Sequence, residues 1–416
     1  MKDLKYLPEF EDLLQDADNA LIRQAQADGK YAIGYTCYHM PEVLLNVDNC
    51  FSTRIRAPRS TSIDIATYYM SNYTCEYARS LLERAIEGGY AFLDGIAGVD
   101  ACSAMNRCYE HMEILQCNEK PHFFVTHTDV PYKIESYTVD QMTTQMRLRL
   151  LDVMHEKLGT DTSDKALLAA VKKHNELCDV MTKIGEFRKL ENPPITGYEY
   201  HVLCLVSYCC PTTLILPMLK KTLTEIKRRK PDVKPKYRAR VVVAGSEIDD
   251  LDFSKLLEDA GALIVADRYC YGSFPGREKI EIDPKRDILR QICLHYMKTS
   301  ECARYMSKEK IDQRRETIDR LAREYGADGI IFEQMKYCDF WAFERPLASH
   351  ILEEEFGWPV LSIDRSYNVR GSGQLRTRFQ AFVEALEIKR IQKQRNAAAT
   401  EAAEAEKTEV ADGEER

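Results

Sequence analysis

Apolar segments that are typical of buried strands alternate along this chain with segments whose apolar residues have the spacing of a helix. Three such strand segments occur in the first part of the sequence: YAIGYT (31–36), FLDGIAGV (92–99) and HFFVTH (122–127). Four more follow in the second part: VVVAGSE (241–247), ALIVAD (262–267), GIIF (329–332) and PVLSID (359–364). Strands that alternate with helices form parallel sheets that helices cover on both faces. The pattern therefore predicts an α/β fold with two domains built on one plan.

The chain divides into five predicted parts. They are an N-terminal helical segment (1–29), a first α/β domain (30–137), a helical layer with a linker (138–236), a second α/β domain (237–391) and an acidic tail (392–416). We expect both α/β domains to be Rossmann-like (flavodoxin-like), and we interpret residues 49–62 as an irregular connection. The Ala/Glu-rich tail has too little apolar surface to offset the entropy cost of ordering, so we expect it to be disordered.

Charge and hydropathy argue against two classes of protein. The formal net charge of -8 includes -5 from residues 397–416, so the rest of the chain is close to neutral at about -3. A nucleic-acid-binding protein would carry a basic surface instead. The chain has no run of about 18 apolar residues, and its N-terminus, MKDLKYLPEFEDLL, is too acidic for a signal peptide. We therefore expect a cytoplasmic protein that binds neither nucleic acid nor membranes.

The chain contains 14 cysteines. Because thiols are kept reduced in the cytoplasm, these residues are either inert and buried or serve as metal-binding and catalytic thiolates. A free cysteine packs like a small apolar residue, so we interpret most of them as core residues. Four of the cysteines lie in apolar or helical segments, and we interpret them as packing residues: Cys178, Cys204, Cys293 and Cys302.

Three other cysteines stand where an α/β fold places its ligands. Cys102 follows the strand segment 92–99, Cys338 follows the strand segment 329–332, and Cys75 opens the helical stretch CEYARSLLERAIEGG. The carboxyl ends of parallel strands line the crevice in which ligands bind. Thiolates that are far apart in sequence and converge in such a crevice suit an iron–sulfur cluster.

The spacing of the cysteines alone leaves other interpretations of the site open. The sequence has no CxxC pair and no Cys/His set in a form useful for zinc, and it has no GxSxG of a serine hydrolase. Cys37 is a candidate nucleophile, because Pro41 and Glu42 mark a helix start close behind it and a helix N-terminus lowers the pKa of a thiol. No partner base for it can be named. Simple packing of the cysteines also remains open at this point.

Longer strings resemble the 2-hydroxyacyl-CoA dehydratase and benzoyl-CoA reductase family. They are GYTCYHMPEVLL (34–45), SNYTCEYARSLLE (71–83), DACSAMNRCYEHM (100–112), MKYCDFW (335–341), FGWPVLSIDRSY (356–367) and GQLRTRFQAFVEAL (373–386). The similarity covers roughly residues 30–390 in the family's order and spacing. Carried over one by one, Cys75, Cys102 and Cys338 stand where the family has its cluster ligands.

The resemblance implies a [4Fe-4S] cluster in the crevice between the two domains, in one catalytic subunit of a heterodimer with a homologous sister subunit. In dehydratases of this kind, a separate ATP-dependent iron–sulfur activator delivers one electron. An (R)-2-hydroxyacyl-CoA then loses water through a ketyl radical and becomes a 2-enoyl-CoA. The alternatives that the resemblance allows are a subunit of an ATP-dependent benzoyl-CoA-type reductase and a non-catalytic electron-relay subunit.

The resemblance also implies roles for other residues near the predicted sheet edge. The turn that contains Cys37, His39 and Glu42 should line the substrate side as catalytic candidates, with Cys37 and His39 handling a proton or hydroxyl; the alternative is that Cys37 packs under the turn. Members with a double-cubane cluster use further cysteines. Ser246 stands at one of those positions, so we expect no second cluster and interpret Cys270 as structural.

Overall fold

The computed structural model describes residues 1–58, 60, 62–233, 236–273, 278–368 and 372–414, with backbone only for 393–394 and 397–414. Its strands form two separate four-stranded sheets, one from each part of the chain predicted to be an α/β domain. All the strand pairs in both sheets are parallel. The predicted fold class, α/β with two Rossmann-like domains, is confirmed.

The first sheet contains β1 (Tyr31–Tyr35), β2 (Cys50–Arg54), β3 (Gly95–Asp100) and β4 (Phe124–Asp129) in the order β2-β1-β3-β4. Strand β2 corrects our interpretation of residues 49–62 as irregular. Its sequence, CFSTR, has little apolar character, but every residue of it is buried. It pairs with β1 in a register that sets Cys50 opposite Tyr31. Pairing with β1 and burial under helices therefore stabilise this strand, although its own residues have a weak preference for strands.

The second sheet repeats this plan. It contains β5 (Ala239–Gly245), β6 (Ala262–Arg268), β7 (Gly329–Met335) and β8 (Val360–Arg365) in the order β6-β5-β7-β8. Residues alternate between its faces, as the two-residue period of a strand requires. Val241 and Val243 face a core that includes helices α11 (Leu251–Asp259) and α15 (Gly373–Glu414). Val242 and Ala244 face a core that includes α13 (Lys308–Glu324) and α14 (Asp339–Glu354). Both faces are therefore covered by helices.

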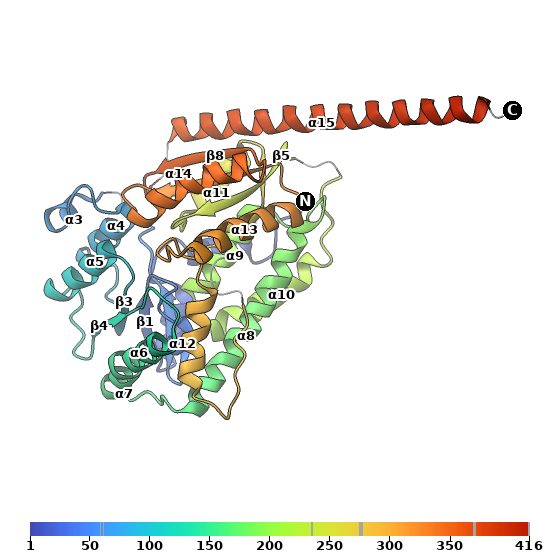
Figure 1. The fold of residues 1–416 in the computed structure, drawn as a ribbon. Coiled ribbons are helices and arrows are strands. Elements are labelled where there is room, and N and C mark those ends of the chain that lie inside the picture. The colour runs from blue at the N-terminus through green and yellow to red at the C-terminus, as the bar shows by residue number, and fades with distance from the viewer. Residues whose placement is uncertain (59, 61, 234–235, 274–277, 369–371, 415–416) are drawn as a thin grey trace.

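The helices fill the layers around the two sheets (Figure 1). They are α1 (Leu7–Leu13), α2 (Ala20–Ala27), η1 (Glu42–Asn46), α3 (Asp64–Tyr69), α4 (Glu76–Ile86), α5 (Ser103–Ile114), α6 (Ser136–Met146), η2 (Arg147–Leu151), α7 (Asp152–Leu158), α8 (Asp164–Glu186), η3 (Phe187–Lys189), α9 (Gly197–Cys209), α10 (Thr212–Ile226), α11 (Leu251–Asp259), α12 (Ile288–Thr299), α13 (Lys308–Glu324), α14 (Asp339–Glu354) and α15 (Gly373–Glu414). Among the described residues, every helix is too short or too polar to cross a bilayer.

Two helices tie the domains together. Helix α9 packs against β2 of the first sheet and β6 of the second, and nearly all of its residues are buried. Helix α12 comes from the second part of the chain but packs against α6 and α8 (Figure 1). Its Ile292, Cys293 and Tyr296 belong to the same core as Ile33 of β1. Some packing contacts therefore cross the predicted domain boundary near residue 237.

Residues 392–414 of the acidic tail belong to α15, a straight helix that extends beyond the body of the protein (Figure 1). Ala, Glu and Lys have high intrinsic helix propensity, which accounts for the helical backbone. The first turns of α15 pack through Phe379 and Val383. The order of residues 392–416 in solution stays a prediction.

A buried ion pair braces the carboxyl edge of the second sheet. Arg365 Nε lies 3.0 Å from Glu333 Oε2, and both side chains are at most 1% exposed. The Ser246 hydroxyl, just after β5, donates to Glu333 Oε1 at 2.9 Å. Arg365 also donates to the carbonyls of Glu247 and Tyr367. The pair thereby fixes the turns that follow β5 and β8.

Replacing Glu333 with Ala should lower the free energy of unfolding by about 3–5 kcal/mol, because it leaves the Arg365 charge buried without its partner. Asp312→Ala, which breaks the exposed i,i+4 pair with Lys308, should change it by less than about 0.5 kcal/mol. Urea unfolding of the two variants measures both values. Equal effects would mean that the buried pair does not brace the edge.

Candidate metal centre

The carboxyl edges of the two sheets face each other across the domain interface. Arg54, the last residue of β2, donates to the carbonyl of Cys270, which follows β6. Tyr77, on α4 of the first domain, shares a hydrogen bond of 2.8 Å with Tyr271 of the second. The loops that follow the strands of both sheets therefore meet at this interface, and we call the region where they meet the crevice. This is where ligands bind in doubly wound sheets.

The three cysteines predicted as cluster ligands occupy equivalent positions in this crevice. Cys75, Cys102 and Cys338 are the N-cap residues of helices α4, α5 and α14. Two of these caps follow a central strand, β3 or β7. We call Cys75, Cys102 and Cys338 the first thiol set.

Contacts between the domains bring this set together. The backbone N–H of Glu76, next to Cys75, donates to the carbonyl of Lys336 at 3.4 Å, two residues before Cys338. Cys75 is part of one hydrophobic core, and Cys102 and Cys338 pack against the same core. The charges of Cys75 and Cys102 also raise the pKa of Cys338, after the larger effect of burial. The three thiols thus pack against one core, and their role as cluster ligands stays a prediction.

Burial keeps these thiols protonated in the metal-free chain. It raises the pKa of Cys75 to about 11, and it raises the pKa of Cys102 and Cys338 further. Backbone N–H groups near the helix starts act in the opposite direction on each pKa, although none of the three thiols makes a full capping hydrogen bond. A metal would have to displace these protons, so metal binding here should release protons.

Cysteine thiolates can bind either a single metal ion or the iron of a cluster. Within the described residues, no group of three or more His, Cys, Asp or Glu side chains is placed to hold one metal ion. A single ion such as zinc needs all its ligands at one point. The thiolates of an iron–sulfur cluster bind different iron atoms and therefore lie farther apart.

Two of the predicted catalytic residues lie beside this crevice. Burial raises the pKa of Cys37 to about 12, with the nearby Cys302 as the next cause. His39 is 2% exposed, and its ring lies edge-on to Tyr305 with 5.4 Å between the ring centres. Its Nε2 has no hydrogen-bond partner among the described residues. Burial and then Arg304 lower the pKa of His39 to about 3.

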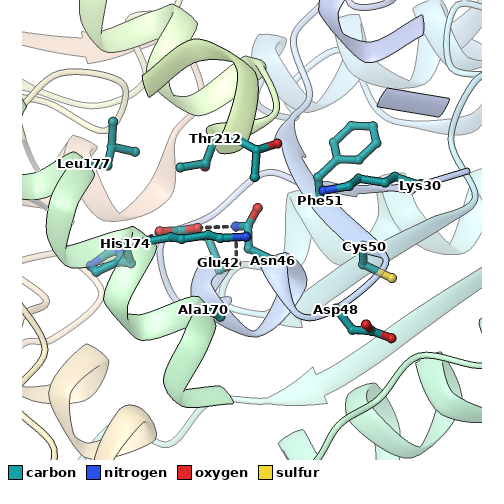
Figure 2. Close-up of a pocket in the computed structure, with 12 residues that line it drawn as sticks. Lys30, Glu42, Asn46, Asp48, Cys50, Phe51, Ala170, His174, Leu177 and Thr212 are labelled. Carbon is teal, nitrogen blue, oxygen red and sulfur yellow. Dashed lines mark hydrogen bonds and ion pairs between the residues drawn. The ribbon is translucent and has the colours of Figure 1, made fainter. Parts of the chain in front are cut away.

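The third predicted catalytic residue, Glu42, faces another part of the protein. Figure 2 shows its carboxylate between His174 of α8 and Asn46. The distances are 2.6 Å to His174 Nδ1 and 2.7 Å to the Asn46 amide. The adjoining cavity measures about 20 Å³, which is enough for one water molecule. The structure does not bring Glu42 into contact with Cys37 or His39, and its catalytic role stays a prediction.

Sequence reasoning missed Cys302 as a residue of the crevice. We assigned it to packing, but it lies in the loop between α12 and α13 and is only partly buried. The six partly buried cysteines of the chain are Cys37, Cys102, Cys117, Cys270, Cys302 and Cys338, and all of these except Cys117 line the crevice or its walls. Cys178, Cys204 and Cys293 are fully buried, so the packing interpretation is confirmed for those three.

Arg54 is the second residue that sequence reasoning missed. It is 2% exposed. Its guanidinium donates to Thr36 O at 2.9 Å and to Cys270 O, lies 3.6 Å from Glu247, and stacks 3.9 Å from the ring centre of Tyr271. One side chain therefore connects the turn before Cys37 with the turn that contains Cys270.

Comparison with known proteins identifies the family of this chain. The family profile described as "2-hydroxyglutaryl-CoA dehydratase, D-component" matches residues 37–386. The chain belongs to this family. The match begins at Cys37, just after β1, and includes β2 to β8 and every cysteine that lines the crevice.

Similar proteins are subunits of larger enzymes. The (R)-phenyllactyl-CoA dehydratase beta subunit of Clostridium sporogenes is 23% identical over 92% of this chain and 99% of its own length. The (R)-2-hydroxyglutaryl-CoA dehydratase subunit beta of Acidaminococcus fermentans is 24% identical over 88% of this chain and 95% of its own length. One of the subunits of benzoyl-CoA reductase from Thauera aromatica is 23% identical over 88% of this chain and 93% of its own length. These relatives are thus similar to the chain along nearly their whole length.

In this D-component protein, Arg54→Lys should lower the free energy of unfolding by about 2 kcal/mol. A lysine ammonium cannot reproduce the planar fork that binds two carbonyls and stacks on Tyr271. Arg107→Lys, on the exposed surface of α5, is the matched control and should be neutral. Urea unfolding measures both variants. No difference between them would show that Arg54 does not hold the domains together.

Proposed function

We propose that this chain is the [4Fe-4S]-bearing subunit of an (R)-2-hydroxyacyl-CoA dehydratase, which removes water from a 2-hydroxyacyl-CoA to give a 2-enoyl-CoA. The observation that carries the proposal is the first thiol set. Three cysteines, each at the N-cap of a different helix, converge between two doubly wound domains in a chain of the D-component family. The names of two relatives support dehydration as the reaction.

In this proposal Cys75, Cys102 and Cys338 hold the cluster. When bound by three thiolates, such a cluster supplies one-electron transfer and an iron corner that is free to accept a substrate oxygen. The ketyl-radical route and the ATP-dependent iron–sulfur activator belong to the same proposal. They require that the chain protect a radical from water and accept an electron from a second protein.

The residues around the first thiol set suit that requirement. Tyr77, Tyr271 and Met335 belong to the same core as Cys75, and their side chains are fully buried. At the rim, Tyr337 adopts a left-handed backbone conformation with φ 64°, and its ring packs edge-on against the exposed Tyr73. Buried walls limit the entry of water. Cys37 and His39 remain the predicted handlers of a proton or hydroxyl.

A sister subunit is part of this proposal. The relatives are named as subunits of dehydratases and of a reductase, which supports a partner chain that completes the enzyme. We propose a heterodimer with a homologous subunit, and an acyl-CoA as the substrate that the two subunits share.

One relative favours a second candidate function. The similarity to a benzoyl-CoA reductase subunit is consistent with net reduction of an aryl-CoA at the same crevice. Product analysis separates the two functions, because dehydration leaves the overall oxidation level of the substrate unchanged and ring reduction does not. A purely electron-relaying subunit would show no change in its cluster spectrum when acyl-CoA is added.

The proposal predicts that Cys338→Ala loses the cluster that this thiol ligates. After anaerobic purification with a sister subunit, the variant should contain less iron and sulfide than the wild type and show weaker brown absorbance, because a cube loses one of its three protein ligands. Cys293→Ala is the control, since Cys293 is fully buried in the core near α6. It should keep its iron, its sulfide and its colour. An unchanged visible spectrum in Cys338→Ala would contradict the ligand assignment.

A further inference from the structure

The carboxylate of Glu247 lies in the middle of the crevice. Glu247 stands two residues after β5, a central strand of the second sheet. Burial raises the pKa of four thiols from loops of both domains, and the charge of Glu247 raises each of these pKa values further: Cys37, Cys75, Cys270 and Cys302. Because electrostatic interactions weaken with distance, one carboxylate that acts on all four thiols has to lie among them.

The backbone around Glu247 is held in place from several sides. Arg365 donates to the carbonyl of Glu247. The carbonyl of Ser246, the residue before it, accepts the backbone N–H of Cys270 at 3.0 Å. The Ser246 hydroxyl donates to Glu333 at 2.9 Å. A reacting side chain needs a support of this kind, because its position has to be kept within about 0.5 Å.

The carboxylate itself is held much less firmly than its backbone. The closest charged group is Arg54, whose Nη2 lies 3.6 Å from Glu247 Oε2, too far for a hydrogen bond. This oxygen is buried and has no hydrogen-bond partner among the described residues. Both carboxylate oxygens of Glu333, by contrast, are bonded, one to Arg365 and one to Ser246. A buried oxygen without a partner is costly, and a ligand that supplies a hydrogen bond would remove that cost.

The charges that surround Glu247 leave its proton exchangeable near neutral pH. Burial raises the pKa of Glu247 to about 7. Arg54 on β2 acts against burial, and so does a hydrogen bond with Cys270, whereas the charges of Asp249 and of Glu333 on β7 raise the pKa further. An acid or base catalyst works best when its pKa lies near the pH at which the enzyme operates.

The three catalytic candidates that the sequence suggested match proton transfer less well. Burial raises the pKa of Cys37 to about 12 and lowers that of His39 to about 3. At neutral pH the thiol therefore keeps its proton and the imidazole lacks one. The carboxylate of Glu42 is bound to His174 of α8. Of these groups and Glu247, only Glu247 lies in the crevice with a proton that can move in both directions.

We propose that Glu247 is the acid–base catalyst of the dehydration. It gives its proton to the departing hydroxyl of the acyl-CoA and takes up the proton that carbon 3 of the acyl chain loses. This inference rests on the proposed function and adds to it a residue that touches the substrate. Arg54 stabilises the carboxylate in the interval between the two proton transfers.

The two proton transfers balance. When the bond between carbon 2 and oxygen breaks, its electron pair leaves with the hydroxide, which becomes water with the proton of Glu247. When carbon 3 loses its proton to the Glu247 carboxylate, the electron pair of that C–H bond forms the double bond to carbon 2. Glu247 is then protonated again. Dehydration leaves the oxidation level of the substrate unchanged, so no further oxidant or reductant is needed.

The test measures dehydration across the pH range by the full chain, purified without oxygen together with a sister subunit. The substrates are a series of 2-hydroxyacyl-CoA thioesters that includes the (R)-phenyllactyl and (R)-2-hydroxyglutaryl thioesters. In the wild type, kcat/KM should fall as the pH rises above the pKa of Glu247, about 7. The reason is that the acid has to carry its proton when the substrate binds.

Glu247→Gln removes the exchangeable proton and keeps the shape of the side chain. It should lower kcat at least about 100-fold, and the remaining activity should no longer fall with rising pH. Glu247→Asp should recover part of the activity together with the pH dependence, which a merely structural role would not explain. Glu353→Gln, on the exposed surface of α14, is the matched control and should behave as the wild type. All four proteins should contain the same amount of iron per chain.

The pH profile of the wild type needs no variant. A wild-type kcat/KM that stays constant across neutral pH would overturn the inference. A Glu247→Gln enzyme with the kcat of the wild type would overturn it as well, and that outcome leaves the proposed function intact. A wild type that contains iron but dehydrates no 2-hydroxyacyl-CoA would overturn the proposed function and the inference together.

Discussion

The buried guanidinium of Arg54 is the contact on which the crevice depends. It leaves the end of β2 in the first domain and reaches the loops after β5 and β6 in the second. A buried charge is stable only if its hydrogen bonds and counter-charge are in place. The edges of the two sheets therefore have to meet in one relative position. Arg56 repeats the arrangement by donating to the Asp249 carbonyl. Two arginines at the end of one edge strand thereby set the distance between the domains.

The identical strand order of the two sheets explains why cysteines gather at this interface. In each sheet the chain moves outward in both directions from a central strand pair, β1 with β3 and β5 with β7. The loops after such a pair diverge and leave an opening. Cys37 and Cys102 follow the first pair, and Cys338 follows the second. When the two openings face each other, residues about 300 positions apart in sequence become neighbours without any local sequence signal.

The sequence predicted the parts of this structure that depend on local patterns. Apolar runs located seven of the eight strands that the described residues form, and the local pattern correctly placed Cys75, Cys102 and Cys338 at the starts of helices. Strand β2 was missed because its stability comes from pairing with β1 rather than from its own composition. Cys302 was missed because it follows a helix, and only the packing of α12 onto the first domain turns the next loop toward the crevice. Glu42 is close to Cys37 in sequence, but the fold directs its carboxylate to α8, a contact that the local pattern could not indicate.

Electrostatics explains why such a crevice suits an anionic centre in particular. An isolated buried thiolate is unfavourable, as the raised pKa values of all three thiols in the first set indicate. Opposing that cost, three helices begin at the thiols of the first set, and each helix start favours nearby negative charge by about 0.3–1 kcal/mol. These contributions are too small to ionise three buried thiols that repel one another. The buried charges of Arg54 and Arg304 add to them, but positive metal is still needed to bring several thiolates together. The two arginines and the three helix starts therefore support the proposed cluster, in which iron would supply the remaining positive charge.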